Sequence, residues 1–474
     1  MTALLGLSEI NVYFCKQIKD IMQIIYDIAK PFDKLLKKQK VIAGEQYRPM
    51  YYVVEQPVDE GLLLYHTMTK ALLLLTPEEA EIYHTTPADL QELISLWFLV
   101  PQSHDDRLLS RQIRDVAKIV AKPVKGITWY SIMTTTDCNA RCFYCYEKGH
   151  AKIPMSKETA GRTADYIIRH CEGKKVCIQW FGGEPLFNKP IITQICQLLK
   201  EAGVEYESRM ISNGYLLDDE TVAEACSLWH LKRIQITLDG TEEVYNRCKA
   251  YIYNKVNAYQ RVIGNIHRLQ NAGIKVLVRM NVDMHNVDNL MELVDELHQV
   301  FPNPNGIYVY VHPLFEEEKG WTAIHDKQKR KVVFNKMLQI RDRLTTYGFF
   351  KDAKLRRKIK TYRCMANNEG CINITPTGDI GKCDHYSDDN FVSHIDSEEW
   401  DEQMLSSFRK THDEIDACKT CFDYPNCFML KKCLATRHCF PESCDDQLDI
   451  IKREMLIVYD NCNKQNKVEN EIQD

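Results

Sequence analysis

The sequence of 474 residues has no long hydrophobic run and no large excess of one charge. Its net charge is −5, so neither nucleic acid nor an anionic membrane is indicated as a partner. No window reaches the roughly 18 uncharged apolar residues that a membrane-spanning helix requires, and no signal peptide is expected at the N-terminus. Repeats and low-complexity segments are also absent. We therefore expect a soluble, cytoplasmic protein of two or three globular domains.

Cysteine is the residue that stands out, with 19 copies. Disulfide bonds are one explanation, but a cytoplasmic chain rich in cysteine more often binds metal. The short spacings between many of these cysteines favour a reducing, anaerobic setting. Seven cysteines lie in apolar patterns and are predicted to be buried thiols: Cys15, Cys171, Cys177, Cys196, Cys226, Cys248 and Cys462.

Three other cysteines are crowded onto one short stretch. Cys138 and Cys142 are separated by three residues, and Cys142 and Cys145 by two. Three thiolates on one loop can hold three irons of a cubane iron–sulfur cluster. Because no fourth cysteine lies nearby, one iron would be open to a small molecule. A zinc site on the three cysteines is the competing interpretation.

The N-terminal quarter divides into two predicted parts. Residues 1–47 are predicted to be a helical extension, because apolar residues recur at helical spacing. Residues 48–122 are predicted to be a winged-helix-like α+β module of three strands followed by three helices. Its strands are predicted at 51–55, 61–65 and 71–75, and its helices from Thr76-Pro77, at 88–97 and at 104–121. Such a module is either a structural cap or a domain that docks a peptide along an exposed strand edge.

From residue 123 to about 349 the pattern alternates between strands and helices. The predicted strands are 127–134, 176–181, 206–212, 233–238, 276–282 and 307–311. The predicted helices are 156–171, 189–201, 219–228, 257–271, 288–300 and 325–346. Six consecutive βα units favour an α/β fold, a partial (β/α)6 TIM-like barrel with its site at the carboxyl ends of the strands. The cysteine loop follows the first strand and therefore lies at that mouth.

Small polar residues follow the next strands at the same mouth. Gly182, Gly183 and Glu184 follow the second strand, Ser212 and Asn213 the third, and Asp239 the fourth. Each motif alone is an ordinary turn. Together, after successive strands, they indicate a ligand site. Tyr245, Arg247 and Lys249 come later in the fourth connection and are predicted to lie on a solvated loop face.

The motifs Cys138-x3-Cys142-x2-Cys145, Gly182-Gly183-Glu184-Pro185, Ser212-Asn213-Gly214 and Leu238-Asp239-Gly240 resemble those of the radical S-adenosylmethionine (SAM) enzymes. The resemblance covers about residues 126–315. It implies a catalytic 4Fe–4S cluster on the three cysteines and a SAM molecule on the open iron. It also implies contacts to SAM from Tyr144, Gly182, Gly183, Glu184, Ser212 and Asn213, with Arg279 and Asn281 as further candidates.

Residues 350–474 resemble the SPASM domain, a cysteine-rich domain that carries auxiliary 4Fe–4S clusters. Gly378-x4-Cys383 in a hairpin at 372–383 and Cys418-x2-Cys421-x5-Cys427 fit its pattern, whereas the spacing to Cys433 departs from it. The resemblance implies two auxiliary clusters. The first is assigned to Cys364, Cys371, Cys383 and Cys433, and the second to Cys418, Cys421, Cys427 and Cys444. Cys439 is an alternative to Cys444, and a zinc ribbon is an alternative to the clusters. A closing helix is predicted at about 446–462.

Among SPASM-bearing radical enzymes, the 125 residues before the cysteine loop favour a maturase of ribosomally made peptides. The expected reaction is a cross-link in a precursor peptide that carries a leader segment, with a thioether as first choice and a carbon–carbon bond as second. A flavodoxin- or ferredoxin-type protein is the expected reductant. The alternatives are an anaerobic sulfatase-maturing, formylglycine-generating enzyme and a non-catalytic iron–sulfur electron carrier or scaffold. General acid or base residues are not assigned; Asp384 and His385 follow Cys383 and are weak candidates.

Overall fold

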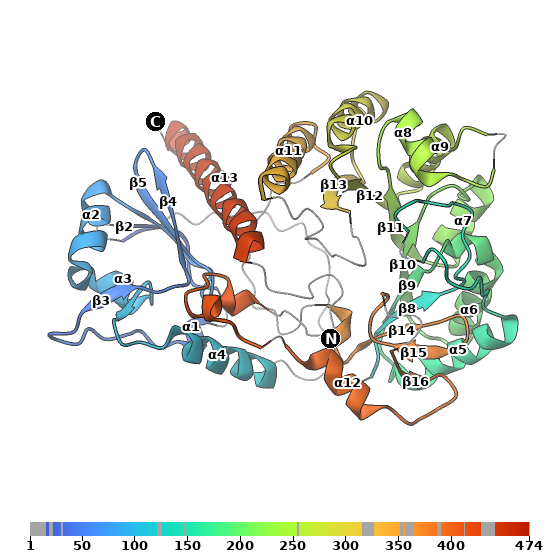
Figure 1. Cartoon of the computed structure of the whole chain (residues 1–474), viewed down its shortest axis with the longest axis horizontal. Helices are drawn as coiled ribbons and strands as arrows, with labels where there is room; N and C mark the ends of the chain where they lie inside the picture. Colours follow the sequence, from blue (N-terminus) through green and yellow to red (C-terminus); the bar gives the residue numbers. More distant parts are fainter. Residues whose placement is uncertain are drawn as a thin grey trace.

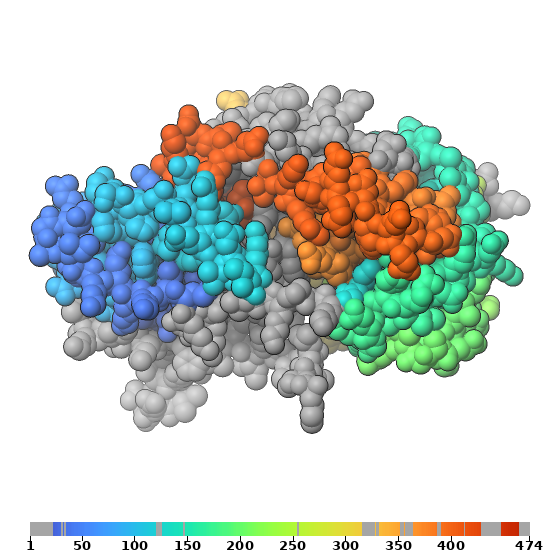
Figure 2. All heavy atoms as spheres, turned by 90° about the horizontal axis from the view of Figure 1, so that it is seen from below, coloured from blue at the N-terminus to red at the C-terminus, as the bar shows by residue number. Residues whose placement is uncertain are grey.

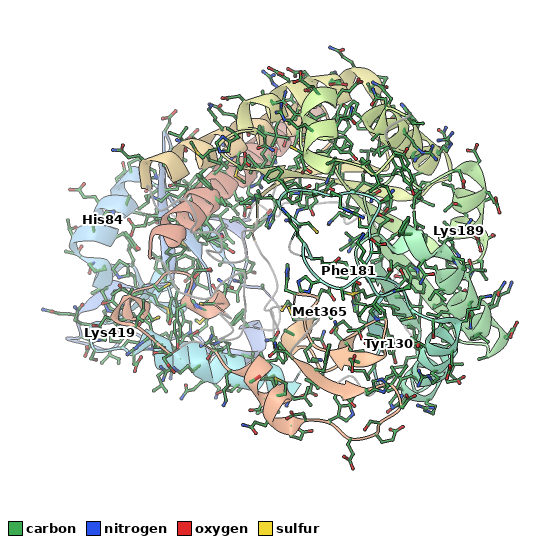
Figure 3. The ribbon with its side chains drawn as sticks, turned by 45° about the vertical axis from the view of Figure 1, so that its right-hand side comes forward. His84, Tyr130, Phe181, Lys189, Met365 and Lys419 are labelled. Atoms are coloured by element: carbon green, nitrogen blue, oxygen red, sulfur yellow. The ribbon has the colours of Figure 1, made fainter. Side chains whose placement is uncertain are left out.

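The structure is a computed structural model that describes most of the chain. The described residues are 16–18, 22–29, 32–120, 126–145, 147–253, 256–314, 327–350, 355, 364–385, 390–411, 413–427 and 441–473. They form two lobes, an N-terminal lobe around an antiparallel sheet and a larger lobe around a mostly parallel sheet (Figure 1). In Figure 3, Tyr130 and Phe181 mark the larger lobe, and His84 and Lys419 mark the other.

The larger lobe contains the six predicted βα units. Its parallel strands are β8 (Trp129–Met133), β9 (Val176–Phe181), β10 (Tyr206–Ser212), β11 (Leu231–Thr237), β12 (Lys275–Val282) and β13 (Ile307–Pro313). Its helices are α5 (Lys157–His170), α6 (Lys189–Glu201), α7 (Asp219–Ser227), α9 (Ala258–Asn271), α10 (Val287–Val300) and α11 (Lys327–Thr346). The prediction of a parallel sheet from six βα units is confirmed. A further short helix, α8 (Glu242–Lys249), was not predicted.

Alternation along the strands separates an apolar outer face from a polar inner face. In β10, Tyr206 and Met210 are buried against the helices, whereas Glu207 and Arg209 point the other way and are half-buried. The helices contribute apolar stripes to the same core, as α6 does with Ile195. Because successive side chains in a strand point to opposite faces, the residues between these core positions line the inside of the sheet. Polar groups from several strands therefore gather inside the partial barrel.

The cysteine-rich segment extends this sheet rather than forming a separate unit. Strand β14 (Cys371–Ile374) pairs in parallel with β8, and β15 (Asp379–Gly381) and β16 (Phe391–His394) follow it. The strand order is β13-β12-β11-β10-β9-β8-β14-β15-β16. The predicted hairpin is confirmed, with Gly378 in its turn at a φ of 98°. The predicted division at residue 350 is therefore crossed by one continuous sheet.

The N-terminal lobe contains the predicted strands and helices of residues 48–122. The predicted strands are β4 (Val53–Val58), β5 (Gly61–His66) and β6 (Leu72–Leu75), and the predicted helices are α2 (Pro77–Thr85), α3 (Gln91–Ser95), which follows the short η1 (Pro87–Asp89), and α4 (Asp106–Val120). The lobe also contains β3 (Tyr47–Pro49) and β7 (Leu99–Pro101), a pair of strands that was not predicted. The predicted helix start is confirmed, since Thr76 and Glu79 form a reciprocal capping box and Pro77 begins α2.

The predicted helical extension over residues 1–47 is wrong. The described part of this segment forms β1 (Lys16–Ile18), β2 (Met22–Tyr26) and the short helix α1 (Phe32–Leu35). Strand β2 pairs with β6 and completes the sheet in the order β1-β2-β6-β5-β4. Both faces of this sheet are covered, so β2 carries apolar residues on both sides and loses the alternation that identifies a strand. The predicted boundary at residue 47 is wrong for the same reason.

The C-terminal segment holds the two lobes together. The segment continues from α12 (Glu402–Arg409) through η5 (Asp416–Lys419) and η6 (Tyr424–Asn426) to the long helix α13 (Pro441–Gln473). Met455 and Val458 of α13 are buried against the sheet of the N-terminal lobe. The ring of Tyr424 stacks on Tyr52 with centroids 6.3 Å apart. Figure 2 shows the segment before α13, in orange, reaching from the N-terminal lobe to the barrel.

The predictions for the isolated cysteines are confirmed in part. Cys171 and Cys196 are buried free thiols. Cys226 is exposed near the end of α7, and Cys462 is disulfide-bonded, so the prediction is wrong for these two. Cys15 lies outside the described residues. Within the described part of the chain, no helix combines the length and the hydrophobicity needed to cross a bilayer.

We predict that stability depends on pH through the buried His66. Burial lowers the pKa of its imidazole to about 3, so the folded chain keeps it neutral, with its Nε2 3.1 Å from the carbonyl oxygen of Trp97. An unfolded chain takes up this proton near pH 6.5. The contribution is therefore complete above pH 6.5 and is lost as the pH falls, by about 1 kcal/mol between pH 6.5 and 5.5. Thermal unfolding of wild type and His66→Gln at both pH values measures it. An equal loss of stability in both proteins would contradict the assignment.

Candidate active site

The three-cysteine loop lies at the carboxyl end of β8, where the sequence places it. Cys138, Cys142 and Cys145 are free and only partly buried. Burial, together with the nearby Glu184 carboxylate and the other two thiols, raises the pKa of Cys138 to about 12. The three sulfur atoms are thus close enough to interact electrostatically. The amide of Ala140 donates to the Cys138 Sγ at 3.3 Å, which shows how the loop turns its backbone towards sulfur.

The surroundings of the loop fit an iron–sulfur cluster. Asn139 is fully buried, and its Nδ2 group has no partner in the described structure, so a donor is available beside the cysteines. The Nδ2 of Asn213 lies 3.7 Å from the Cys138 Sγ. Hydrogen bonds to cluster and cysteine sulfur are a normal part of such sites. Among the described residues, no group of three or more His, Cys, Asp or Glu side chains is arranged to hold a single metal ion.

Two glycines let the turn after β9 press against the cysteine loop. Gly182 has a φ of 123°, and a Cβ there would lie 2.2 Å from the carbonyl oxygen of Thr135. A Cβ on Gly183 would lie 2.4 Å from the carbonyl oxygen of Asp137. The amides of Gly183 and Glu184 donate to these same two oxygens, each at 3.0 Å. Neither position can accept a larger residue without moving the cysteine loop.

The Glu184 carboxylate joins the ends of the second and third strands. It is fully buried and accepts hydrogen bonds from the Ser212 hydroxyl at 2.9 Å, the Asn213 amide at 2.7 Å and the Leu186 amide at 3.1 Å. Burial raises its pKa to about 7, against the effect of these donors. The predicted contact of Glu184 with an ammonium group stays a prediction. What the structure adds is that Glu184 fixes the Ser212-Asn213 turn beside Cys138.

Tyr144 forms one wall of a cavity beside the cysteine loop. The cavity has a volume of about 220 Å3. Its lining comes from the cysteine loop, α8 and the ends of β11 and β12: Phe143, Tyr144, Asp239, Val244, Arg247, Cys248, Asn281, Asp283, His285, Asn286 and Leu314. The Tyr144 hydroxyl donates to the buried carboxylate of Asp239. A flat ligand such as a nucleobase would have an aromatic wall here.

Arg279 and Asn281 lie on the same face of the fifth strand, and their side chains are hydrogen-bonded to each other. Asn281 is buried, and its amide and Nδ2 groups donate to the Asp239 Oδ1 at 3.1 and 3.0 Å. Arg279 lies inside the partial barrel, where its Nη2 is 3.0 Å from the His312 Nδ1. The Arg279 Nε also donates to the Asn281 Oδ1 at 2.8 Å, so Arg279 joins the Tyr144 hydroxyl network through Asn281.

The strand-end prediction missed how deeply this network is buried. Tyr245 and Lys249, predicted to lie on a solvated face, are fully buried or nearly so. The prediction was wrong because charged and polar residues in the connection after a strand normally face water. The Lys249 ammonium instead lies 2.8 Å from the Asp239 carboxylate. The acidic residue Asp239 in the strand-end motif is the sequence feature that could have indicated a partner for Lys249.

The C-terminal cysteines divide into two groups in different lobes. Cys364, Cys371 and Cys383 lie on or beside the β14–β15 hairpin. Burial, with the nearby Cys177 and Cys364 thiols, raises the pKa of Cys371 to about 11, and the Lys382 ammonium opposes that rise. Cys418 and Cys421 pack against an apolar cluster of the N-terminal lobe, with Cys427 at the end of the same loop. Cys433 and Cys439 lie outside the described residues, as does the side chain of Cys444.

Asp384 and His385 face the inside of the partial barrel. The Gln179 side-chain amide lies 3.5 Å from the Asp384 Oδ2, and burial raises the pKa of Asp384 to about 6. Burial, with the Arg279 charge, lowers the pKa of His385. Gln179 belongs to β9, so both residues are brought from the cysteine-rich segment into the lumen of the sheet.

A family model for the radical SAM superfamily matches residues 132–300. The chain carries a radical SAM domain. This radical SAM enzyme is similar to GTP 3′,8-cyclase of Clostridium perfringens (strain SM101 / Type A), at 27% identity over 55% of the chain and 82% of the relative. It is also similar to the probable GTP 3′,8-cyclase of Methanocaldococcus jannaschii, at 26% identity over 52% and 78%. A non-catalytic electron carrier is no longer a reasonable alternative.

A solved structure of histidine-tagged anSMEcpe with bound AdoMet shares the fold of the radical SAM enzyme. The TM-score is 0.55 at 14% identity, over 71% of this chain and 99% of that one. Native anSMEcpe with bound AdoMet and Cp18Cys peptide gives a TM-score of 0.54 at 14% identity, with the same coverage. At this identity the likeness concerns the fold alone. A radical SAM domain implies SAM and a 4Fe–4S cluster, and the cysteine loop fits that cluster.

We predict that Glu184→Gln weakens SAM binding. A glutamine offers one acceptor oxygen in place of two, so at least one of three buried donors loses its partner, at a cost of about 1–3 kcal/mol. The loosened Ser212-Asn213 turn should raise KM for SAM roughly tenfold or more. The measurement is 5′-deoxyadenosine formation against SAM concentration in reconstituted protein. Glu201→Gln, on the exposed end of α6, is the matched control. The same KM in both variants would count against this role.

Proposed function

We propose that this radical SAM enzyme modifies a ribosomally made precursor peptide. A thioether cross-link from a cysteine is the first choice of product, and a carbon–carbon cross-link the second. The observation that carries the proposal is the lobe that precedes the radical SAM domain. The order of β4–β6 followed by α2–α4 supports a winged-helix-like module, and extended peptides can bind an exposed sheet by adding a strand to its edge.

The docking edge follows from the order of strands in this lobe. Among the described residues the outer strands are β1 and β4, because β2 already pairs with β6. Strand β4 contains Pro57, which has no N–H to donate, and an edge proline discourages the addition of a strand. We therefore assign leader docking to the edge of β1. The leader would then pair with β1, and β1 and β2 would separate it from the three predicted strands β4, β5 and β6.

The two groups of C-terminal cysteines support auxiliary clusters in a SPASM-type domain. Cys364, Cys371 and Cys383 would share one 4Fe–4S cluster with Cys433. Cys418, Cys421 and Cys427 would share the other with Cys444 or, alternatively, Cys439. The placement of the two triplets in different lobes supports two sites rather than one. A zinc ribbon on the second triplet is the alternative, and metal analysis distinguishes iron with sulfide from zinc.

The chemistry of a thioether cross-link balances with these parts. A cluster held by Cys138, Cys142 and Cys145 would, together with SAM, supply the 5′-deoxyadenosyl radical that removes one hydrogen atom from a substrate carbon. One C–H and one S–H bond break and one C–S bond forms, so the substrate also gives up one proton and one electron. An auxiliary cluster can accept the electron, and polar groups inside the barrel, such as Asp384, can receive the proton. A flavodoxin- or ferredoxin-type protein in the cytoplasm would supply the initiating electron.

A second candidate is the conversion of a peptide cysteine or serine into formylglycine. The peptide-bound structure of anSMEcpe, which shares the fold, is the reason to consider it. The names of the sequence relatives also make GTP a substrate to test. Those relatives match only about half of the chain, whereas the N-terminal lobe and the cysteine-rich segment fit a peptide substrate better.

One anaerobic assay separates these reactions. Reconstituted protein is incubated with SAM, a reductant and a short precursor peptide encoded beside its gene, and the products are analysed by mass spectrometry. A cross-link removes two hydrogen atoms and leaves no aldehyde. Formylglycine reacts with a hydrazine probe, and GTP cyclisation consumes GTP without the peptide. Consumption of GTP with no change in any peptide would overturn the proposal.

We predict that changing Cys138, Cys142 and Cys145 together to Ala abolishes SAM cleavage. The variant should keep the iron of the auxiliary clusters, about eight atoms for two cubanes. Assays of 5′-deoxyadenosine and of iron per chain check both statements. The matched control changes Cys171, Cys196 and Cys226 to Ala, because these thiols lie away from the loop. Cleavage retained by the first variant would show that the catalytic cluster is held elsewhere.

We predict that the leader segment protects β1 from hydrogen exchange. Strand addition would place backbone hydrogen bonds on Lys16–Ile18, so amide exchange should slow there when the precursor binds. Exchange of the full-length protein is followed by mass spectrometry, with a scrambled leader as the control. Protection at Val53–Val58 with none at β1 would place docking at the other edge.

A further inference from the structure

Lys249 makes an unusual set of contacts for the last residue of a surface helix. It ends α8 and is 2% exposed. Its Nζ lies 2.8 Å from the Asp239 Oδ2, 2.5 Å from the Tyr144 hydroxyl oxygen and 2.6 Å from the Thr237 Oγ1. An ammonium has three protons to donate, and these three acceptors come from the cysteine loop and from the end of β11.

The main chain at Lys249 holds the same loop. The amide of Arg141 donates to the Lys249 carbonyl oxygen at 2.8 Å, and the amide of Ile252 donates to the Asn139 carbonyl oxygen at 2.9 Å. The Cys142 Sγ lies 4.0 Å from the Lys249 carbonyl oxygen. Ala250 adopts a left-handed conformation with a φ of 44°, which turns the chain after α8 towards the loop. The segment from Lys249 to Ile252 therefore holds the cysteine loop in place through two backbone hydrogen bonds.

The ion pair between Lys249 and Asp239 has little exposure to water. Asp239 is 1% exposed and also accepts hydrogen bonds from Asn281. Removing two charges from water carries a desolvation penalty, so a buried ion pair does not by itself indicate a gain in stability. Its presence here calls for a functional explanation. Here the Lys249 ammonium contacts Tyr144, which lies between Cys142 and Cys145, so its charge lies beside the cysteine loop.

We propose that Lys249 is a positioning residue for the catalytic cluster: it fixes the Cys138–Cys145 loop and Tyr144, and its charge favours the reduced cluster. The proposal rests on the assignment of the cluster to these cysteines. Reduction adds one negative charge, and a fixed ammonium stabilises that charge most in a buried site where water does not screen it. The same ammonium holds the Tyr144 hydroxyl, so the aromatic wall of the adjacent cavity and the cluster potential depend on one side chain.

The test compares Lys249→Met, Lys249→Arg and Lys232→Met. Lys232 lies exposed on β11 and is the matched control. The readout is the midpoint potential of the EPR signal that changes when SAM is added, because only a cluster with an open iron responds to SAM. We expect a shift to lower potential and a higher KM for SAM in Lys249→Met. Lys249→Arg and Lys232→Met should keep the wild-type potential. An unchanged potential in Lys249→Met would overturn the proposal.

A second neutral variant covers the case in which Lys249→Met fails to assemble. Lys249→Gln keeps a donor to Asp239 without the charge, and iron content is measured for all variants. If both neutral variants lose the SAM-responsive cluster and Lys249→Arg keeps it, a cation is required to form the loop, which supports the proposal. If Lys249→Gln keeps the cluster at the wild-type potential, the proposal is wrong. No precursor peptide enters this test, so failure of the peptide-maturase proposal cannot be mistaken for failure here.

Discussion

The close approach of two loops at the barrel mouth is the constraint on which the site depends. The turn after β9 reaches the cysteine loop because Gly182 and Gly183 carry no side chain, and two backbone hydrogen bonds then hold the loops together. Glu184 ties the next strand end to this pair. On the opposite side, the end of α8 holds the loop through Lys249. Two separate segments of the protein therefore hold the cysteine loop in place without any contribution from a bound cluster.

Much of the barrel and its mouth could be predicted from the sequence because their signals are local. Strand β9 and helix α6 match their predicted bounds, since each has its own apolar pattern and clear ends. The Gly182-Gly183-Glu184 turn was recognised for the same reason. The two groups of cysteines in the C-terminal segment are implied by the resemblance to the SPASM domain. Three members of each group lie in different lobes, and their role as cluster ligands stays a prediction.

The errors arise where distant segments meet. The helical prediction for β2 is wrong because both faces of its sheet are covered, which removes the alternating pattern of a strand. Its partner β6 also lies about fifty residues away in the sequence. Strand β14 pairs with β8, which lies more than two hundred residues earlier in the sequence, and a local sequence pattern cannot predict such a pairing. Lys249 looked solvated because its partner Asp239 stands at a strand end, outside the helix that carries the lysine. In each case a tertiary contact outweighed the local preference.

The pairing of β14 with β8 has a consequence for any shortened form of this protein. Strand β8 leads directly into the cysteine loop, and β14 supplies the neighbour that keeps its backbone groups hydrogen-bonded on that side. A chain that stopped at the end of the radical SAM domain would leave β8 as an open edge carrying Trp129 and Tyr130. Unpaired edges of this kind recruit other strands and aggregate. The barrel and the hairpin of the cysteine-rich segment share one sheet, so exchanging either between related proteins without the other would expose this edge.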